Sequence, residues 1–225
     1  MNRDVNNINK NTLLIIPCCA RKSSGGKPLP KNYSDPLSKY ICPSAYKNLV
    51  DIRKDHIAQH IKHSDQYMPA IDRYNGNLYT AFPTLSKCIR NNTNIEGKPK
   101  LLILSALYGP LHPESLINDY NLIMPISKNG FWALNFPAFL SDYVNHNKIE
   151  YIRFYCGTST GYYTVVNQSA TPLLGGHTTL KGVTHCNVVN GNSYHTPYNH
   201  GLQLATDLGC GSFKFTRKVK CIANG

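Results

Sequence analysis

Short, continuous apolar runs alternate along the chain with longer stretches in which apolar residues recur every three or four positions. Residues 12–16, 100–105 and 151–156 form such runs, and each is followed by a polar loop. Continuous runs of this length are typical of strands buried on both faces. Residues 44–63 and 130–147 instead show helical spacing. Because strands alternate with helices, we predict the α/β class, with a mostly parallel central sheet flanked by helices.

Weaker patterns predict the remaining elements. A second helix is expected over residues 77–90, after the Asn75-Gly76 turn signal, and a further helix over residues 195–208. Residues 182–189 and 213–222 are expected to form a strand and a basic terminal strand or tail. No repeat or linker divides the chain. We therefore expect one α/β domain over residues 12–225, preceded by a disordered lead-in at residues 1–11.

The net charge of the chain indicates what kind of partner it binds. The chain of 225 residues has 24 Lys and Arg against 12 Asp and Glu, a formal net charge of +12. This exceeds what a domain of this size needs for solubility, so we expect a polyanionic partner. Fifteen tyrosines add rings that can stack on unpaired bases. Nucleic acid is the partner that this composition favours.

Other features exclude several classes of protein. The longest apolar runs are too short to cross a bilayer, and the polar N-terminus lacks the basic segment and apolar run that export requires. The eight cysteines are expected to be reduced thiols. The sequence contains no Cys-x-x-Cys pair, so no zinc site is expected. We expect a cytoplasmic monomer that has no membrane contact, no metal and no cofactor.

Three polar motifs follow the three predicted strands. They occupy residues 17–22 (Pro-Cys-Cys-Ala-Arg-Lys), 105–109 (Ser-Ala-Leu-Tyr-Gly) and 157–162 (Gly-Thr-Ser-Thr-Gly-Tyr). Ligands of open α/β sheets bind outside the carboxyl ends of the strands, so one pocket built from all three loops is expected. The predicted substrate-binding residues are Cys18, Cys19, Arg21, Lys22, Tyr74, Ser105, Tyr108, Gly109, Gly157, Ser159 and Tyr162.

These motifs allow several kinds of chemistry. Arg21 and Lys22 could hold a phosphate, and Cys18 could be an activated nucleophile or a buried packing residue. Residues 157–161 suit anion binding at a helix N-terminus, but they lack the Lys-Ser/Thr ending of a nucleotide triphosphatase loop.

Acid–base candidates are few. Asp35 and Asp119 are the predicted catalytic carboxylates, which would orient water or stabilise an oxocarbenium-like state. A structural role as a helix cap or ion-pair partner is the alternative for both, and for Asp72 and Glu114. Histidines at positions 177, 185, 195 and 200 crowd the last third of the chain, where they could act as general acids or as surface residues.

Two segments resemble a known family. Residues 69–79 (Pro-Ala-Ile-Asp-Arg-Tyr-Asn-Gly-Asn-Leu-Tyr) and residues 104–122, beginning Leu-Ser-Ala-Leu-Tyr-Gly-Pro, resemble the YaaA family, bacterial proteins associated with peroxide stress and DNA binding. Asp119 stands where that family usually has proline. Residues 17–22 are similar to the Pro-Cys-Ser-x-x-Lys loop of the archaeosine-synthase lineage, which acts on a modified base in transfer RNA, with Cys19 in place of the serine.

The resemblance implies a compact α/β fold with a basic cleft, distantly like the uracil-DNA-glycosylase architecture. It also implies a helix-hairpin-helix-like element within residues 108–122 that would grip a DNA backbone. We therefore expect a DNA-binding enzyme that acts on a nucleobase, such as a DNA glycosylase that removes a damaged or modified base, with DNA preferred over RNA. The alternatives are a non-enzymatic DNA-binding stress-response protein and a base-modifying transferase acting on RNA.

Overall fold

One six-stranded sheet organises the chain. The computed structural model describes residues 8–60, 65–174, 176, 178–187, 196–213 and 218–224. The elements in chain order are β1 (Thr12–Pro17), the 3-10 helix η1 (Pro36–Tyr40), α1 (Pro43–His60), β2 (Met68–Pro69), α2 (Ala70–Arg73), α3 (Leu85–Asn92), β3 (Lys100–Ser105), β4 (Gly109–Leu111), β5 (Leu116–Ile117), α4 (Phe131–His146), β6 (Tyr151–Phe154), α5 (Gly161–Ala170), the 3-10 helix η2 (Thr171–Leu173), β7 (Gly182–Asn187), α6 (Thr196–Asp207) and β8 (Lys218–Asn224).

The strand order is β4-β3-β1-β6-β7-β8. β3, β1, β6 and β7 run parallel, whereas β4 and β8 pair antiparallel at the two edges. A separate two-stranded sheet joins β2 to β5. The predicted α/β class with a mostly parallel sheet is therefore confirmed.

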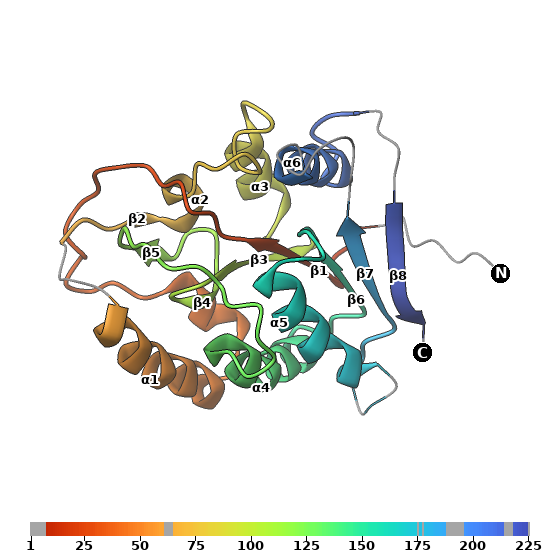
Figure 1. Ribbon diagram of the computed structural model, residues 1–225, viewed down its shortest axis with the longest axis horizontal. Coiled ribbons are helices and arrows are strands. Elements are labelled where there is room, and N and C mark those ends of the chain that lie inside the picture. Colours follow the sequence, from red (N-terminus) through yellow and green to blue (C-terminus); the bar gives the residue numbers. More distant parts are fainter. Residues whose placement is uncertain are drawn as a thin grey trace.

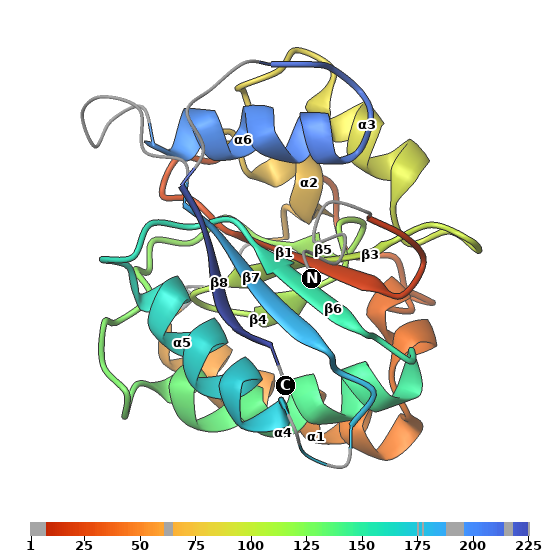
Figure 2. The ribbon, with the colours of Figure 1, turned by 90° about the vertical axis from the view of Figure 1, so that its right-hand side faces the viewer.

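Helices cover both faces of the sheet. Figure 2 shows α1, α4 and α5 on one side and α2, α3 and α6 on the other, and Figure 1 shows the same layers from the front. Leu13, Leu14 and Ile16 of β1 are fully buried because β1 is a central strand with helices above and below. No helix among the described residues is long and apolar enough to cross a membrane.

One predicted helix boundary was wrong. The helix expected over residues 77–90 is α3, Leu85–Asn92, because Pro83 lacks an amide hydrogen and the residues before it form turns. Asn9 and Thr12 form a hydrogen-bonded turn ahead of β1, with Thr12 N 3.0 Å from Asn9 O. Residues 1–7 of the expected lead-in lie outside the described residues.

The expected helix-hairpin-helix-like element is also absent from residues 108–122, all of which the structure describes. Instead β4 pairs with β3, and β5 pairs with β2. Gly109 adopts a positive φ of 65°, and the ring of Trp132 fills the space that a side chain would need. Pro110 and Pro113 further oppose a helix here.

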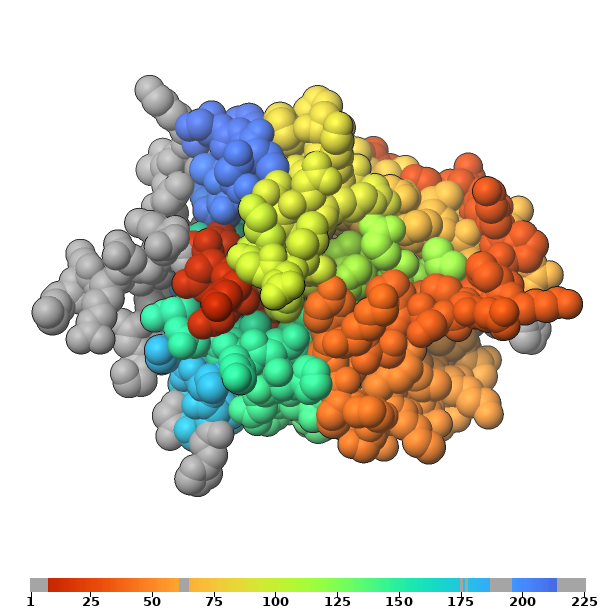
Figure 3. Space-filling view, turned by 180° about the vertical axis from the view of Figure 1, so that it is seen from behind, coloured from red at the N-terminus to blue at the C-terminus, as the bar shows by residue number. Residues whose placement is uncertain are grey.

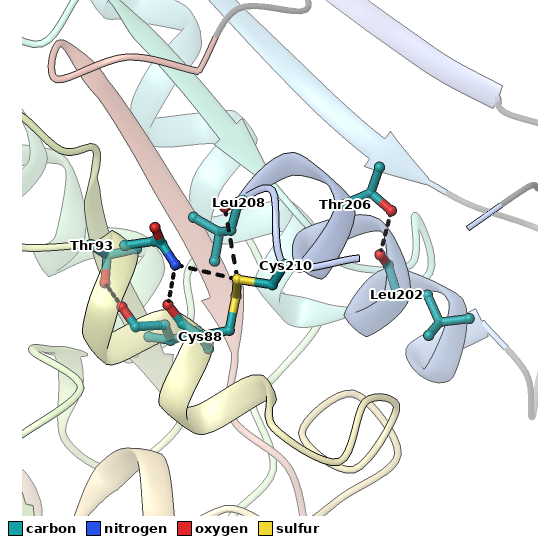
Figure 4. The surroundings of a disulfide bond; sticks show 8 residues. Cys88, Thr93, Leu202, Thr206, Leu208 and Cys210 are labelled. Carbon is teal, nitrogen blue, oxygen red and sulfur yellow. Dashed lines mark hydrogen bonds between the residues drawn. A yellow bond between two sulfur atoms is a disulfide. The ribbon is translucent and has the colours of Figure 1, made fainter. Parts of the chain in front are cut away.

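A disulfide bond joins Cys88 to Cys210, so the prediction that all cysteines are reduced was wrong. Cys88 lies on α3, and Cys210 follows α6 (Figure 4). The pair is separated by 122 residues, so no local spacing pattern reveals it. On the face seen in Figure 3, the surface of α6 (blue) lies against the segment around α3 (yellow to yellow-green).

Candidate functional site

A pocket of about 680 Å³ opens at the carboxyl ends of β1 and β6. The chain leaves β1 towards β3 on one side and leaves β6 towards β7 on the other, so the strand order reverses between these two neighbours. Ligands of open α/β sheets bind at this kind of switch point. We call this cavity the strand-end pocket. Its lining comes from residues 17–21, 76–78, 156–160, Tyr162, Thr196, Pro197 and His200.

Two of the three predicted loops therefore meet in one pocket. Of the predicted binding residues, the structure places Cys18, Cys19, Arg21, Gly157, Ser159 and Tyr162 in the strand-end pocket. Tyr74, Ser105, Tyr108 and Gly109 do not line it. Lys22 lines a neighbouring cavity.

The thiol of Cys18 is the centre of a hydrogen-bond network at the pocket floor. Its Sγ lies 2.9 Å from the hydroxyl of Tyr162 and accepts a bond of 3.3 Å from the hydroxyl of Tyr120. The amide of Ala106 donates to the same sulfur at 3.5 Å. Burial raises the pKa of both Tyr120 and Tyr162, so these hydroxyls keep their protons at neutral pH.

The Ser105 motif supports this floor from behind. The Tyr120 hydroxyl lies 2.7 Å from Ser105 Oγ and 2.8 Å from the Tyr74 hydroxyl. Ser105 Oγ also accepts hydrogen bonds from the amides of Leu107 and Tyr108, at 3.2 and 3.0 Å. Because Ser105 is fully buried and satisfies these amides, it positions the loop rather than contacting a ligand.

Cys19 is a neutral thiol. Burial raises its pKa to about 11. Its Sγ donates to the carbonyl of Arg21 at 2.9 Å and accepts from the amide of Gly76 at 3.2 Å. A protonated, hydrogen-bonded thiol is a poor nucleophile, so Cys19 shapes the wall of the pocket.

The hydroxyl-rich loop leads into the N-terminus of α5. Thr160 caps this helix, because its Oγ1 accepts a bond of 3.3 Å from the amide of Tyr163 and donates to the carbonyl of Gly157 at 2.8 Å. Thr158 and Ser159 line the pocket beside this helix end. The positive end of the helix dipole favours negative charge there, as the sequence predicts.

His200 supplies a polar edge on the opposite wall. It is 2% exposed, and among the described residues its Nε2 has no hydrogen-bond partner. Burial lowers the pKa of His200 to about 3, so the ring is neutral at physiological pH. The Nε2 of a neutral imidazole can donate a hydrogen bond to a ligand or accept one from it, depending on the tautomer, but the ring cannot act as an imidazolium acid. His185 is committed to the carbonyl of Cys156 at 2.6 Å, while His177 and His195 lie outside the described residues.

The walls formed by α6 and by residues 76–78 were not predicted. Gly76 packs so close to Cys19 that an added Cβ would lie 2.7 Å from the Cys19 Cβ. Gly201, inside α6, likewise leaves room for the carbonyl of Leu78. A glycine within a helical pattern is the one sequence signal of such close approach.

A second cavity, of about 550 Å³, adjoins the first and is lined by Ala20, Lys22, Asp119, Tyr120 and Asn121. We call it the Lys22 pocket. The Nζ of Lys22 lies 4.1 Å from the centroid of the Tyr120 ring and donates to the carbonyl of Ala20 at 3.2 Å. Burial lowers the pKa of Lys22. Ala20 lines both pockets, so the two cavities meet at this residue.

The predicted catalytic carboxylates have different surroundings. Asp35 lies in neither pocket: its Oδ2 pairs with Arg53 Nη1 at 3.0 Å, and its Oδ1 accepts bonds from Ser115 Oγ and the Leu37 amide at 2.6 and 3.1 Å. These contacts give it the structural role of a cap and ion-pair partner. Asp119 is exposed and lines the Lys22 pocket. Asp72 and Glu114 both pair with Arg90 at 2.6 Å.

Comparison with known proteins identifies the family. The model of the family described as peroxide stress protein YaaA matches residues 32–149. This segment includes Tyr74, Ser105 and Tyr120, which support the pocket floor, but neither residues 17–22 nor residues 157–162. No curated protein matches the chain. With more than half of its length matched, the chain belongs to the YaaA family of peroxide stress proteins.

Proposed function

We propose that this chain is a DNA-binding enzyme that takes an extruded nucleobase into the strand-end pocket and hydrolyses its N-glycosidic bond. The observation that carries the proposal is the pocket itself, which has apolar walls, one neutral imidazole and a hydroxyl-rich helix N-terminus. Base-directed enzymes commonly bind the flipped base in such a pocket, and about 680 Å³ is ample for a nucleotide.

Each wall has a matching part of the nucleotide. Pro17, Leu78 and Pro197 supply apolar surface for the faces of a base. The Nε2 of His200, which has no hydrogen-bond partner within the described part of the chain, can donate a hydrogen bond to the edge of the base or accept one from it. Thr158 and Ser159 at the start of α5, with Arg21 on the opposite loop, suit a flanking phosphate. The net charge of +12 favours a polyanion as the wider partner.

Asp119 is the carboxylate best placed to assist hydrolysis. No carboxylate lies among the described residues that line the strand-end pocket, but Asp119 lies in the adjoining cavity beyond Ala20. A base held in the first pocket would place its sugar near Ala20, where Asp119 can orient water and stabilise a developing oxocarbenium charge. This arrangement would resemble uracil-DNA glycosylases in architecture only.

The main rival is a non-enzymatic DNA-binding stress protein. The absence of a carboxylate from the described lining of the strand-end pocket favours this alternative, because binding alone needs none. A transferase acting on RNA is a third possibility, favoured by the Cys18 sulfur and its hydrogen bonds from Tyr120 and Ala106.

Base release distinguishes these functions. The protein is incubated with DNA and RNA oligonucleotides that each carry one modified base, and released bases are measured by mass spectrometry. Alkali then cleaves any abasic DNA. We expect release from DNA. Release from RNA alone would favour the transferase, and salt-dependent binding without release across the panel would favour the binding protein.

A pocket-filling variant tests the location. A Cβ at Gly157 would meet only Thr160 Cγ2 among the described residues beyond its chain neighbours, at 3.6 Å, so Gly157→Leu should fold while filling the cavity. Gly176→Leu, outside the pocket, is the matched control. Base release that survives in Gly157→Leu would exclude this pocket as the site.

A further inference from the structure

The Lys22 pocket brings together an amine, a carboxylate and an aromatic ring that the proposed hydrolysis does not fully use. The Nζ of Lys22 is held between the carbonyl of Ala20, at 3.2 Å, and the ring of Tyr120, at 4.1 Å. An antiparallel β-bridge pairs the backbone of Lys22 with that of Tyr74 and fixes its position. The amine therefore has a defined position, unlike that of a solvated surface lysine.

The surroundings of this amine favour nucleophilic chemistry. Burial lowers the pKa of Lys22, which increases the neutral fraction, although the nearby Cys18 and Asp119 act in the opposite direction. No carboxylate among the described residues forms an ion pair with Lys22. Asp119 lines the same cavity, where it can accept and return a proton.

The position of the cavity indicates which electrophile it would meet. The Lys22 pocket and the strand-end pocket share Ala20, so a nucleotide whose base fills the first cavity extends its sugar towards the second. Removal of a base leaves a deoxyribose whose ring-opened form carries an aldehyde at C1′. We infer that Lys22 forms a Schiff base with the C1′ aldehyde of an abasic site in DNA, an activity that rests on the proposed function as the source of its substrate.

The reaction balances without an added reagent. Asp119 takes one proton from the Lys22 ammonium, and the neutral amine adds to C1′. As the C–N bond forms, the carbonyl π bond breaks towards oxygen, and a proton passes from nitrogen to that oxygen to give a neutral carbinolamine. Asp119 then returns its proton to the C1′ hydroxyl, the C–O bond breaks, and water leaves. The product is a protonated imine that links Lys22 to the sugar, with Asp119 again a carboxylate.

Borohydride trapping tests this step on the full chain. A single-stranded oligonucleotide with one abasic site is mixed with the protein and sodium borohydride, which reduces an imine to a stable amine. Proteolysis and mass spectrometry then locate the adduct. We expect it on Lys22. An adduct on other lysines, or no adduct, would overturn the inference.

Substitutions separate nucleophilicity from charge. Lys22→Arg keeps the cation but removes the nucleophile, so trapping should be lost while salt-dependent DNA binding is retained. Lys100→Arg is the matched control. Lys100 is the first residue of β3, at the end of the strand away from the pockets, and its Nζ lies 5.3 Å from the centroid of the Tyr40 ring. Burial lowers the pKa of Lys100 as it does that of Lys22. Asp119→Asn should slow trapping by about 100-fold. Trapping that persists in Lys22→Arg would show that Lys22 is at most a phosphate contact.

The two proposals fail separately. Abasic DNA has already lost its base, so trapping does not require the strand-end pocket and should persist in Gly157→Leu. Trapping without base release in the wild type would retain the Lys22 step and remove the glycosylase. Base release without a Lys22 adduct would do the reverse.

Discussion

The sulfur of Cys18 lies 2.9 Å from the hydroxyl oxygen of Tyr162, although 144 residues separate them along the chain. This contact joins the loop after β1 to the first turn of α5, the two segments that form facing parts of the strand-end pocket. The pocket therefore depends on side-chain hydrogen bonding as well as on the sheet that carries the two loops.

Tyr162→Phe should destabilise the fold slightly. The substitution removes the hydroxyl that pairs with Cys18, and a net hydrogen bond of this kind contributes about 1 kcal/mol to the free energy of unfolding. Urea denaturation measures the change. Tyr151→Phe, on a side chain that is 39% exposed, is the control and should have little effect. Equal stabilities for the two variants would remove the structural role of the contact.

Asp35→Ala should lower the free energy of unfolding by about 3–5 kcal/mol, because it removes the carboxylate that pairs with the buried guanidinium of Arg53. Asp51→Ala breaks the exposed pair with Lys47 and should cost less than about 1 kcal/mol. Chemical denaturation of both variants makes the comparison. A stable Asp35→Ala protein that had lost base release would instead support the catalytic role that the sequence suggested.

Reduction of Cys88–Cys210 should destabilise the protein by about 2–5 kcal/mol, since the bond closes a loop of more than a hundred residues. Thermal unfolding with and without dithiothreitol measures this loss. The double variant Cys88→Ser, Cys210→Ser should unfold at the lower temperature in both conditions. A wild type indifferent to reductant would contradict the prediction.

His200 should make stability depend on pH. Burial lowers its folded pKa to about 3, below the ordinary histidine pKa of 6.5 that the unfolded state is expected to show, so the unfolded chain binds a proton that the folded chain does not. Stability is then complete above pH 6.5 and falls by about 1.4 kcal/mol per unit as the pH drops from about 6 to about 4. His200→Gln should show a shallower slope in urea denaturation at several pH values. Parallel slopes would mean that His200 is not buried in the neutral form.

The sheet could be predicted because its signal is local. Residues 12–16 and 100–105 are continuous apolar runs, and only a strand covered on both faces buries every side chain of such a run. The order of strands then brought the loops at residues 17–21 and 157–160 into one pocket, as their positions after the strands had indicated.

The function of individual polar residues was harder to predict. Ser105 and Tyr108 follow a strand in the same way as Cys18 does. However, the hydroxyl of Ser105 accepts hydrogen bonds from two backbone amides, and the hydroxyl of Tyr108 accepts one from the amide of Asn118. Whether a polar side chain bonds to the backbone or stays available to a ligand depends on which amides the fold leaves unpaired beside it. Sequence patterns do not carry that information. The disulfide and the α6 wall of the pocket could not be predicted either, because both depend on contacts between residues that are distant in the sequence.

The bond between Cys88 and Cys210 also turns the intervening chain, from α3 through α6, into a covalent ring. A single proteolytic cut anywhere inside that ring would leave both fragments linked. A nicked molecule would therefore migrate as one species on a non-reducing gel and separate only when the sulfurs are reduced. Damage to the backbone in this half of the protein need not release the helix that closes the pocket.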